Sequence, residues 1–197
     1  MEVLIRASDV LNKIVRTAGK LFAWLSVPMI ILILFDVITR RFLVLGSTKL
    51  QEMEWHLHAA LFLMCLGYAY LQNSHVRIEL LRERFAPRLK AWIELFGCVI
   101  FLISFCVLMI YFGINFAHRS YVMGEVSSAL TGLSHRWVIK SFIPLGIFFL
   151  LMAGLSVAFR NIVYLFGPEH LRREAEAHAP ELRNADEELA QVRLKLK

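Results

Sequence analysis

The amino-acid sequence predicts an all-α membrane protein with four transmembrane helices, cytoplasmic N- and C-termini and interfacial amphipathic helices. Hydrophobic residues make up 58% of the 197 residues, above the roughly 45–50% apolar content of soluble domains. Four apolar stretches divide the chain. Of its 22 Lys and Arg residues, 15 lie in the first, third and fifth of the segments flanking these stretches and 6 in the second and fourth, while Arg160 lies near the inner end of the fourth stretch. Because short loops rich in Lys and Arg stay cytoplasmic, this alternation predicts the orientation.

Residues 1–20 are expected to form a cytoplasmic interfacial helix. They are too polar for the apolar core of a cleavable signal peptide. Their basic residues lie largely apart from the apolar ones, as in helices that rest at a membrane surface. The apolar residues that fall near one helical face are Val3, Val10, Leu11, Ile14, Val15 and Ala18.

One transmembrane domain is expected over residues 21–167, because the chain leaves little room for a separate soluble domain. A helix needs roughly 20 apolar residues to cross a hydrocarbon core of about 30 Å. The third and fourth stretches are longer, which favours tilt or packing against a larger partner. The four predicted spans are residues 21–39, 55–73, 91–116 and 141–166.

Few residues inside these spans are polar or helix-breaking. Pro28 is expected to bend the first span. Glu94 and Arg160 lie near the inner ends of the third and fourth spans, where either charge could snorkel to the surface. The three cysteines lack paired spacing and are expected to be packing residues rather than disulfide or zinc ligands; they are Cys65, Cys98 and Cys106.

Two further cytoplasmic segments are predicted. Between the second and third spans, residues 75–92 alternate apolar and basic side chains around Pro87, which favours a short headgroup-level helix broken at that proline. Residues 168–197 form a polar helical tail with a weak apolar stripe. This stripe is too short for a stable coiled coil, so a solvated tail and a docking helix both stay open.

The residue pattern indicates no enzyme, cofactor site or metal site. It contains no phosphate-binding glycine loop, nucleophile elbow or HExxH motif. The densest polar cluster is QEMEWHLH at residues 51–58, in which Glu52 precedes His56 by one helical turn. Metal binding there lacks a third and fourth convergent ligand. A polar helix start with Trp55 at the interface is the favoured interpretation.

Asp36 and Arg40 lie four residues apart at the outer end of the first span. An ion pair would offset the cost of a carboxylate near lipid, about 2.5–3.5 kcal/mol at a helix centre and less near its edge. Asp36 is therefore expected to face protein. A proton or ion pathway and plain solvent exposure are the alternatives.

Several short motifs occur in an order and spacing typical of one family. They are DVITRRF at residues 36–42, EW at 54–55, HVRIELL at 75–81, GEVSS at 124–128, GLSHRWVIK at 132–140 and PLG at 144–146. On these motifs, about residues 21–167 resemble the small membrane subunit, DctQ type, of tripartite ATP-independent periplasmic (TRAP) transporters. The last three motifs are similar to the branch labelled mannitol or chloroaromatic transport.

The resemblance implies a complex in the bacterial inner membrane. A periplasmic solute-binding protein would capture an organic acid or related solute, and a large permease subunit would move it inward on a sodium gradient. The small subunit would brace the permease among membrane lipids, bind no nucleic acid and help dock the binding protein through residues 41–51 and 118–136. Its candidate polar anchors are Asp36, Arg40, Glu54, Arg77, Arg136 and Lys140.

Two other interpretations remain open. A haem-binding membrane cytochrome could pair His58 with His118, but His75 has no evident partner and the fourth span contains no histidine. An autonomous small transporter could use Asp36 or Glu94 as its coupling carboxylate, although neither lies near mid-span.

Overall fold

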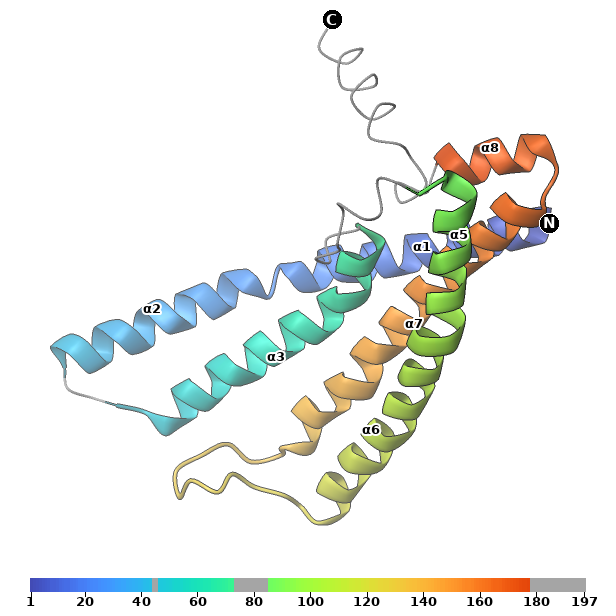
Figure 1. The fold of residues 1–197 in the computed structure, drawn as a ribbon. Helices are drawn as coiled ribbons and strands as arrows, with labels where there is room; N and C mark the ends of the chain where they lie inside the picture. The colour runs from blue at the N-terminus through green and yellow to red at the C-terminus, as the bar shows by residue number, and fades with distance from the viewer. Residues whose placement is uncertain (44–45, 73–84, 178–197) are drawn as a thin grey trace, which may run out of the picture.

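The computed structural model describes residues 1–43, 46–72 and 85–177. Every regular element within these ranges is helical (Figure 1), which confirms the predicted all-α class. The helices are α1 (Glu2–Ala23), α2 (Ser26–Phe42), α3 (Thr48–Leu71), α5 (Pro87–Phe96), the π-helix η1 (Gly97–Ile103), α6 (Ser104–Val122), α7 (Trp137–Phe166) and α8 (Glu169–Ala177). Of the predicted tail, only the part up to residue 177 lies within the described residues.

Three helical segments of the described chain are long and apolar enough to cross a membrane. They are Glu2–Phe42, Pro87–Val122 and Trp137–Phe166, and they contain the predicted first, third and fourth spans. Residues 55–71 of the predicted second span lie in α3, where Glu54, His56 and His58 lower the mean hydropathy, and residue 73 lies outside the described residues. The four-span count and the orientation stay predictions.

The first segment is interrupted just before Pro28. A turn at Trp24 and Leu25 separates α1 from α2, and the two helices continue in nearly the same direction (Figure 1). Pro28 has no N–H for the Trp24 carbonyl, which instead accepts a 3.1 Å hydrogen bond from the Val27 N–H. The proline therefore accounts for the position of this break.

Helix α7 is the centre of the packing and contacts α1, α3, α5, α6 and α8. Its most extensive contact is with α3. A Cβ added to Gly67 would lie 2.6 Å from the Phe149 carbonyl oxygen, and one added to Gly146 would lie 2.5 Å from that of Leu63. The two backbones therefore touch, as small residues permit between membrane helices.

The third predicted span is a continuous rod of α5, η1 and α6 (Figure 1). Its π-helical section was not predicted from the sequence. Leu102 of η1 packs against Gly154 of α7. The Tyr70 hydroxyl of α3 donates to the Glu94 carboxylate at 3.2 Å and lies 3.0 Å from the Cys98 sulfur. Glu94 is thus engaged by a neighbouring helix rather than only by solvent.

A buried polar seam joins α1 to α7. The hydroxyls of Ser8 and Ser156 each donate to the other residue's carbonyl oxygen at 3.0 Å. Arg160 donates to the Asp9 carboxylate at 3.0 Å, and Asn12, with its amide oxygen turned toward it, accepts from the same guanidinium at 2.8 Å. Arg160 is only 6% exposed. Arg160 therefore does not extend to the surface, as its place near the end of the span would have allowed, because α1 supplies its partners within the bundle.

The α8 end of the bundle has a small core of its own. The start of α1, the start of α5, the end of α7 and α8 all contribute to it. Arg172 of α8 donates to the Tyr164 carbonyl at 3.0 Å and so ties α8 to α7. The buried residues of this core are Ile5, Ala91, Val163, Tyr164, Leu171 and Ala175.

Candidate functional site

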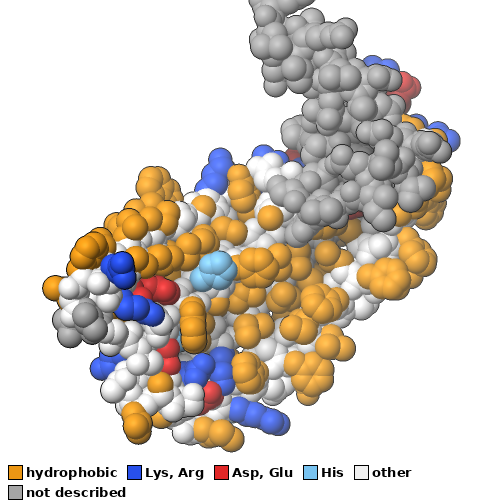
Figure 2. Space-filling view, turned by 60° about the vertical axis from the view of Figure 1, so that its left-hand side comes forward, with side chains coloured by type: hydrophobic (Ala, Val, Ile, Leu, Met, Phe, Trp, Pro, Cys, Tyr) orange, Lys and Arg blue, Asp and Glu red, His pale blue; other side chains and the backbone are white. Residues whose placement is uncertain are grey.

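Most of the predicted polar anchors gather at the end of the bundle opposite α8. This end, here called the loop end, comprises the end of α2, the start of α3, the end of α6, the start of α7 and the connection at residues 123–136. It lies at the lower left of Figure 1. Figure 2 brings this side forward and shows Lys, Arg, Asp and Glu side chains side by side, bordered by hydrophobic surface.

Asp36 and Arg40 form the predicted ion pair within α2. Asp36 is buried, at 4% exposure, so the expectation that it faces protein is confirmed. Arg40 also reaches α3, where the Gln51 amide oxygen, turned toward it, accepts two hydrogen bonds of 2.9 Å. Asp36 therefore orients an arginine that links α2 to α3.

Glu52 fastens the connection between α6 and α7. Its carboxylate accepts a 2.7 Å hydrogen bond from the Leu133 backbone N–H and another from the Ser127 hydroxyl. These donors, the Leu133 N–H above all, lower the pKa of Glu52, and the nearby Arg136 charge adds to the effect. The connection is thereby attached to the start of α3.

The role of Glu52 was missed in the sequence, where the spacing indicated only that it lies one helical turn before His56. His56 instead contacts the Glu52 backbone carbonyl through Nδ1. The Glu52 carboxylate points to donors about 80 residues away, and no local pattern could have indicated them. Within the described ranges, no group of three or more His, Cys, Asp or Glu side chains could hold a metal ion.

Glu125 and Lys140 form a second attachment, between the connection and α7. They make an ion pair, and the Lys140 ammonium lies 4.0 Å from the centre of the Phe116 ring of α6. Hydrogen bonding from Lys140 is the main reason that the pKa of Glu125 is lowered. Lys140 therefore joins the connection, α6 and α7.

The other predicted anchors have different outcomes. Arg136 lies near Glu52 and Glu125 and lowers the pKa of both. Its Nε and the Glu54 Oε1 are buried and have no hydrogen-bond partner among the described residues. Arg77 lies outside the described residues. An interface role for any of the six remains a proposal.

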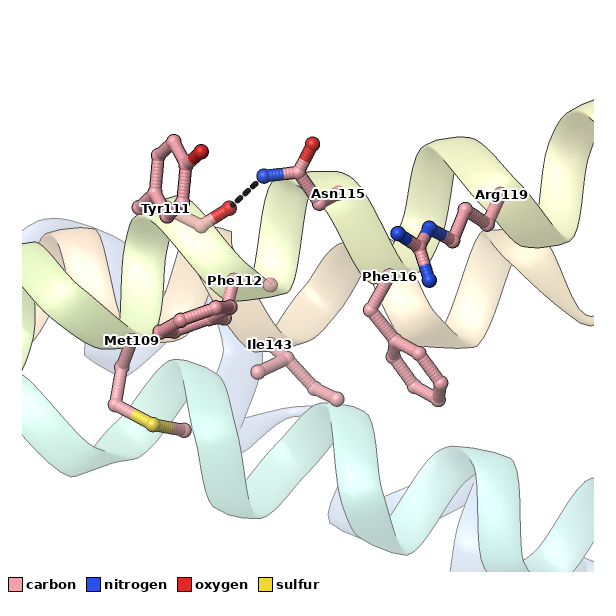
Figure 3. Close-up of a pocket in the computed structure, with 8 residues that line it drawn as sticks. Met109, Tyr111, Phe112, Asn115, Phe116, Arg119 and Ile143 are labelled. Atoms are coloured by element: carbon pink, nitrogen blue, oxygen red, sulfur yellow. Dashed lines mark hydrogen bonds between the residues drawn. The ribbon is translucent and has the colours of Figure 1, made fainter.

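A shallow groove of about 570 Å³ runs along α6 toward the loop end (Figure 3). Its wall is largely apolar and aromatic, and Arg119 stands beside Phe116. The Asn115 amide does not reach into the groove but donates to the Tyr111 carbonyl at 2.9 Å. The lining residues are Met109, Tyr111, Phe112, Gly113, Asn115, Phe116, Arg119 and Ile143.

The family described as tripartite ATP-independent periplasmic transporters, DctQ component, matches residues 29–163. This is more than half of the chain and includes the whole loop end, whereas α1 and α8 lie outside it. No curated protein matches the chain. With its apolar helices and this match, the chain belongs to the DctQ family, the small membrane component of TRAP transporters.

Proposed function

We propose that this protein is the accessory subunit that braces the large permease of a sodium-coupled TRAP transporter. It would also help dock the periplasmic binding protein during uptake of an organic acid or related solute. DctQ proteins work within TRAP complexes that contain a large permease and a binding protein. The bracing role rests on one observation at the loop end. The charged side chains of Arg40 and Lys140 each link separate helices or loops of this chain and so hold them in a fixed arrangement.

The outer surface of α2 supports a protein neighbour. Helix α2 packs chiefly against α3, so most of its apolar side chains are uncovered in the isolated chain. A polar link such as Arg40 to Gln51 would hold this helix at a fixed angle against a partner. The exposed apolar residues of α2 include Val27, Ile30, Ile31, Leu34, Phe35 and Ile38.

In this proposal α3 is the second of four transmembrane helices and the loop end faces the periplasm. The backbone contacts of Gly67 and Gly146 place α3 directly beside α7, which is a candidate span. The 24 residues of α3 have a length of about 36 Å. That length matches a hydrocarbon core of about 30 Å.

Copurification tests the bracing role. An affinity-tagged chain, expressed with its neighbouring transport subunits, is expected to bring down a large permease subunit identified by mass spectrometry. Asp36→Asn removes the carboxylate that orients Arg40 and should lower the recovered permease several-fold. Arg41→Gln is the control, because Arg41 is an exposed neighbour. Equal recovery with both variants, or transport by the chain alone in liposomes, would contradict the proposal.

The connection at residues 123–136 supports the docking role. Its tip exposes apolar side chains, with Leu130 fully exposed and Val126 at 62%, while Glu52 and Glu125 hold its base. Leu130→Glu should slow transport that depends on the binding protein and leave permease recovery unchanged. Unchanged transport would remove the docking role without touching the bracing role.

A further inference from the structure

Helix α1 has three distinct faces rather than two. One face is buried against α7 and α3 and contains Ile5, Ser8, Asn12, Val15 and Gly19. A second face carries basic side chains that are all exposed, at positions 6, 13, 16 and 20. A third face is apolar and also exposed: Val3, Val10, Ile14 and Leu21 are between 44% and 78% exposed.

Helical geometry separates these faces cleanly. At about 100° per residue, the buried positions fall within an arc of about 80°, the basic positions within about 80° and the exposed apolar positions within about 40°. The exposed apolar arc lies roughly opposite the buried one. Val3, Val10 and Ile14 of the predicted apolar face therefore point away from the bundle, whereas Val15 of that face is buried in it.

The seam with α7 fixes the rotation of α1 about its own axis. The reciprocal hydrogen bonds of Ser8 and Ser156 hold the buried face in place, and Arg160 engages Asp9, which lies within the arc of the basic row. Within the described part of the chain, the four basic side chains of α1 form no ion pair. The row is therefore available to an external anion.

The length of the α1–α2 segment places this row at a membrane boundary. Its 41 residues correspond to about 60 Å of helix, roughly twice the thickness of a hydrocarbon core. The apolar half is α2, whereas α1 carries six charged side chains before residue 21. The charged half therefore begins near the level where the hydrocarbon ends and the headgroups begin.

We propose that α1 is an acidic-phospholipid binding helix. Its basic row contacts lipid phosphates, and Val3, Val10 and Ile14 enter the adjoining acyl region, the arrangement that basic amphipathic helices adopt at anionic membranes. The residues of this row are Arg6, Lys13, Arg16 and Lys20. Because α1 precedes the residues matched by the DctQ family, this proposal depends neither on that match nor on the proposed bracing role.

Competition between lipids tests the charge requirement. The full-length protein, with any subunits that copurify, is exchanged into detergent containing equal amounts of phosphatidylglycerol and phosphatidylcholine, and the retained lipids are quantified by native mass spectrometry. The variant combines Lys13→Gln, Arg16→Gln and Lys20→Gln. A matched control combines Arg41→Gln, Lys49→Gln and Arg119→Gln, which removes three exposed charges at the loop end.

The wild-type protein should retain phosphatidylglycerol preferentially. The α1 variant should lower the ratio of the two retained lipids about 10-fold or more, because each surface Lys or Arg contributes roughly a five-fold preference. The control should change it less than about two-fold. An unchanged ratio in the α1 variant, or an equal loss in both variants, would overturn the proposal.

Crosslinking tests what covers the apolar face. A benzophenone amino acid placed at Val10 in the full-length protein in native membranes should yield lipid adducts on illumination. A crosslink to another polypeptide would instead identify α1 as a protein interface and refute the lipid assignment. The same label at Leu130, which is fully exposed on the loop end, is the control. It reports the background yield of lipid adducts at a site outside the lipid.

Discussion

Adding one methyl group at the α3–α7 contact should measurably destabilise the bundle. In Gly67→Ala, the new Cβ would lie 2.6 Å from the Phe149 carbonyl oxygen and 2.8 Å from its carbon. Both are backbone atoms, which cannot rotate away as a side chain could. Ordinary carbon contacts begin near 3.5 Å, so the helices must separate by about 0.8 Å.

The expected cost follows from overpacking. Inserting a methyl group into a close-packed contact costs about 1–3 kcal/mol, which corresponds to a fall of about 3–9 °C in Tm for a chain of this size. Gly146→Ala should act similarly, because its Cβ would lie 2.5 Å from the Leu63 carbonyl oxygen. The double variant should lose less stability than the sum of the two single variants, because one separation of α3 from α7 relieves both steric clashes.

A thiol-reactive fluorogenic dye provides the assay. Cys98 and Cys106 are buried thiols that form no disulfide, so the temperature at which they react reports the opening of the bundle. Gly97→Ala is the matched control: it makes the same change within a helix, but no atom lies within 4 Å of the added Cβ. Its Tm should stay constant or rise slightly, because alanine is favoured over glycine in helices. If Gly67→Ala and Gly97→Ala have the same Tm, the proposed backbone contact is wrong.

Two other predictions concern the seam and the loop end. Asp9→Asn leaves the buried Arg160 with a weaker acceptor and should lower Tm by a few degrees. The effect is modest because the Asp9 side chain is 49% exposed. The control Glu2→Gln, on the same helix and outside any ion pair in the described chain, should leave Tm unchanged. The lowered pKa values of Glu52 and Glu125 mean that the attachment of residues 123–136 is complete above the ordinary glutamate pKa of about 4.3. The attachment is lost as the pH falls through the lower pKa values that the two glutamates have in the folded state. Amide exchange in residues 123–136, corrected for the intrinsic exchange rate, should therefore accelerate on acidification. Glu52→Gln should show fast exchange at Leu133 already at neutral pH, and an identical pH profile in that variant would contradict this assignment.

The sequence predicted local structure correctly where the chemistry of a single residue determined what its near neighbours in the chain had to do. Asp36 is costly to expose to lipid, and a cation one turn away was the obvious partner. The break before Pro28 likewise follows from a missing N–H. Arg160 and Glu52 differ because the sequence offers each charged side chain several physically acceptable partners. Their partners lie on other elements and become neighbours only when the bundle is assembled.

The same distinction bears on α3, the proposed second span. The hydropathy of α3 is lowered by polar residues at 54, 56 and 58, in its first half, close to the loop end. Further along, Met64 and Leu71 are buried, and Gly67 touches α7 directly. A helix that faces other helices over much of its surface needs less apolar exterior than one surrounded by lipid. The depth of α3 in the bilayer would then follow from α7 rather than from its own composition, so Gly67→Ala should loosen α3 before it affects the contact between α6 and α7.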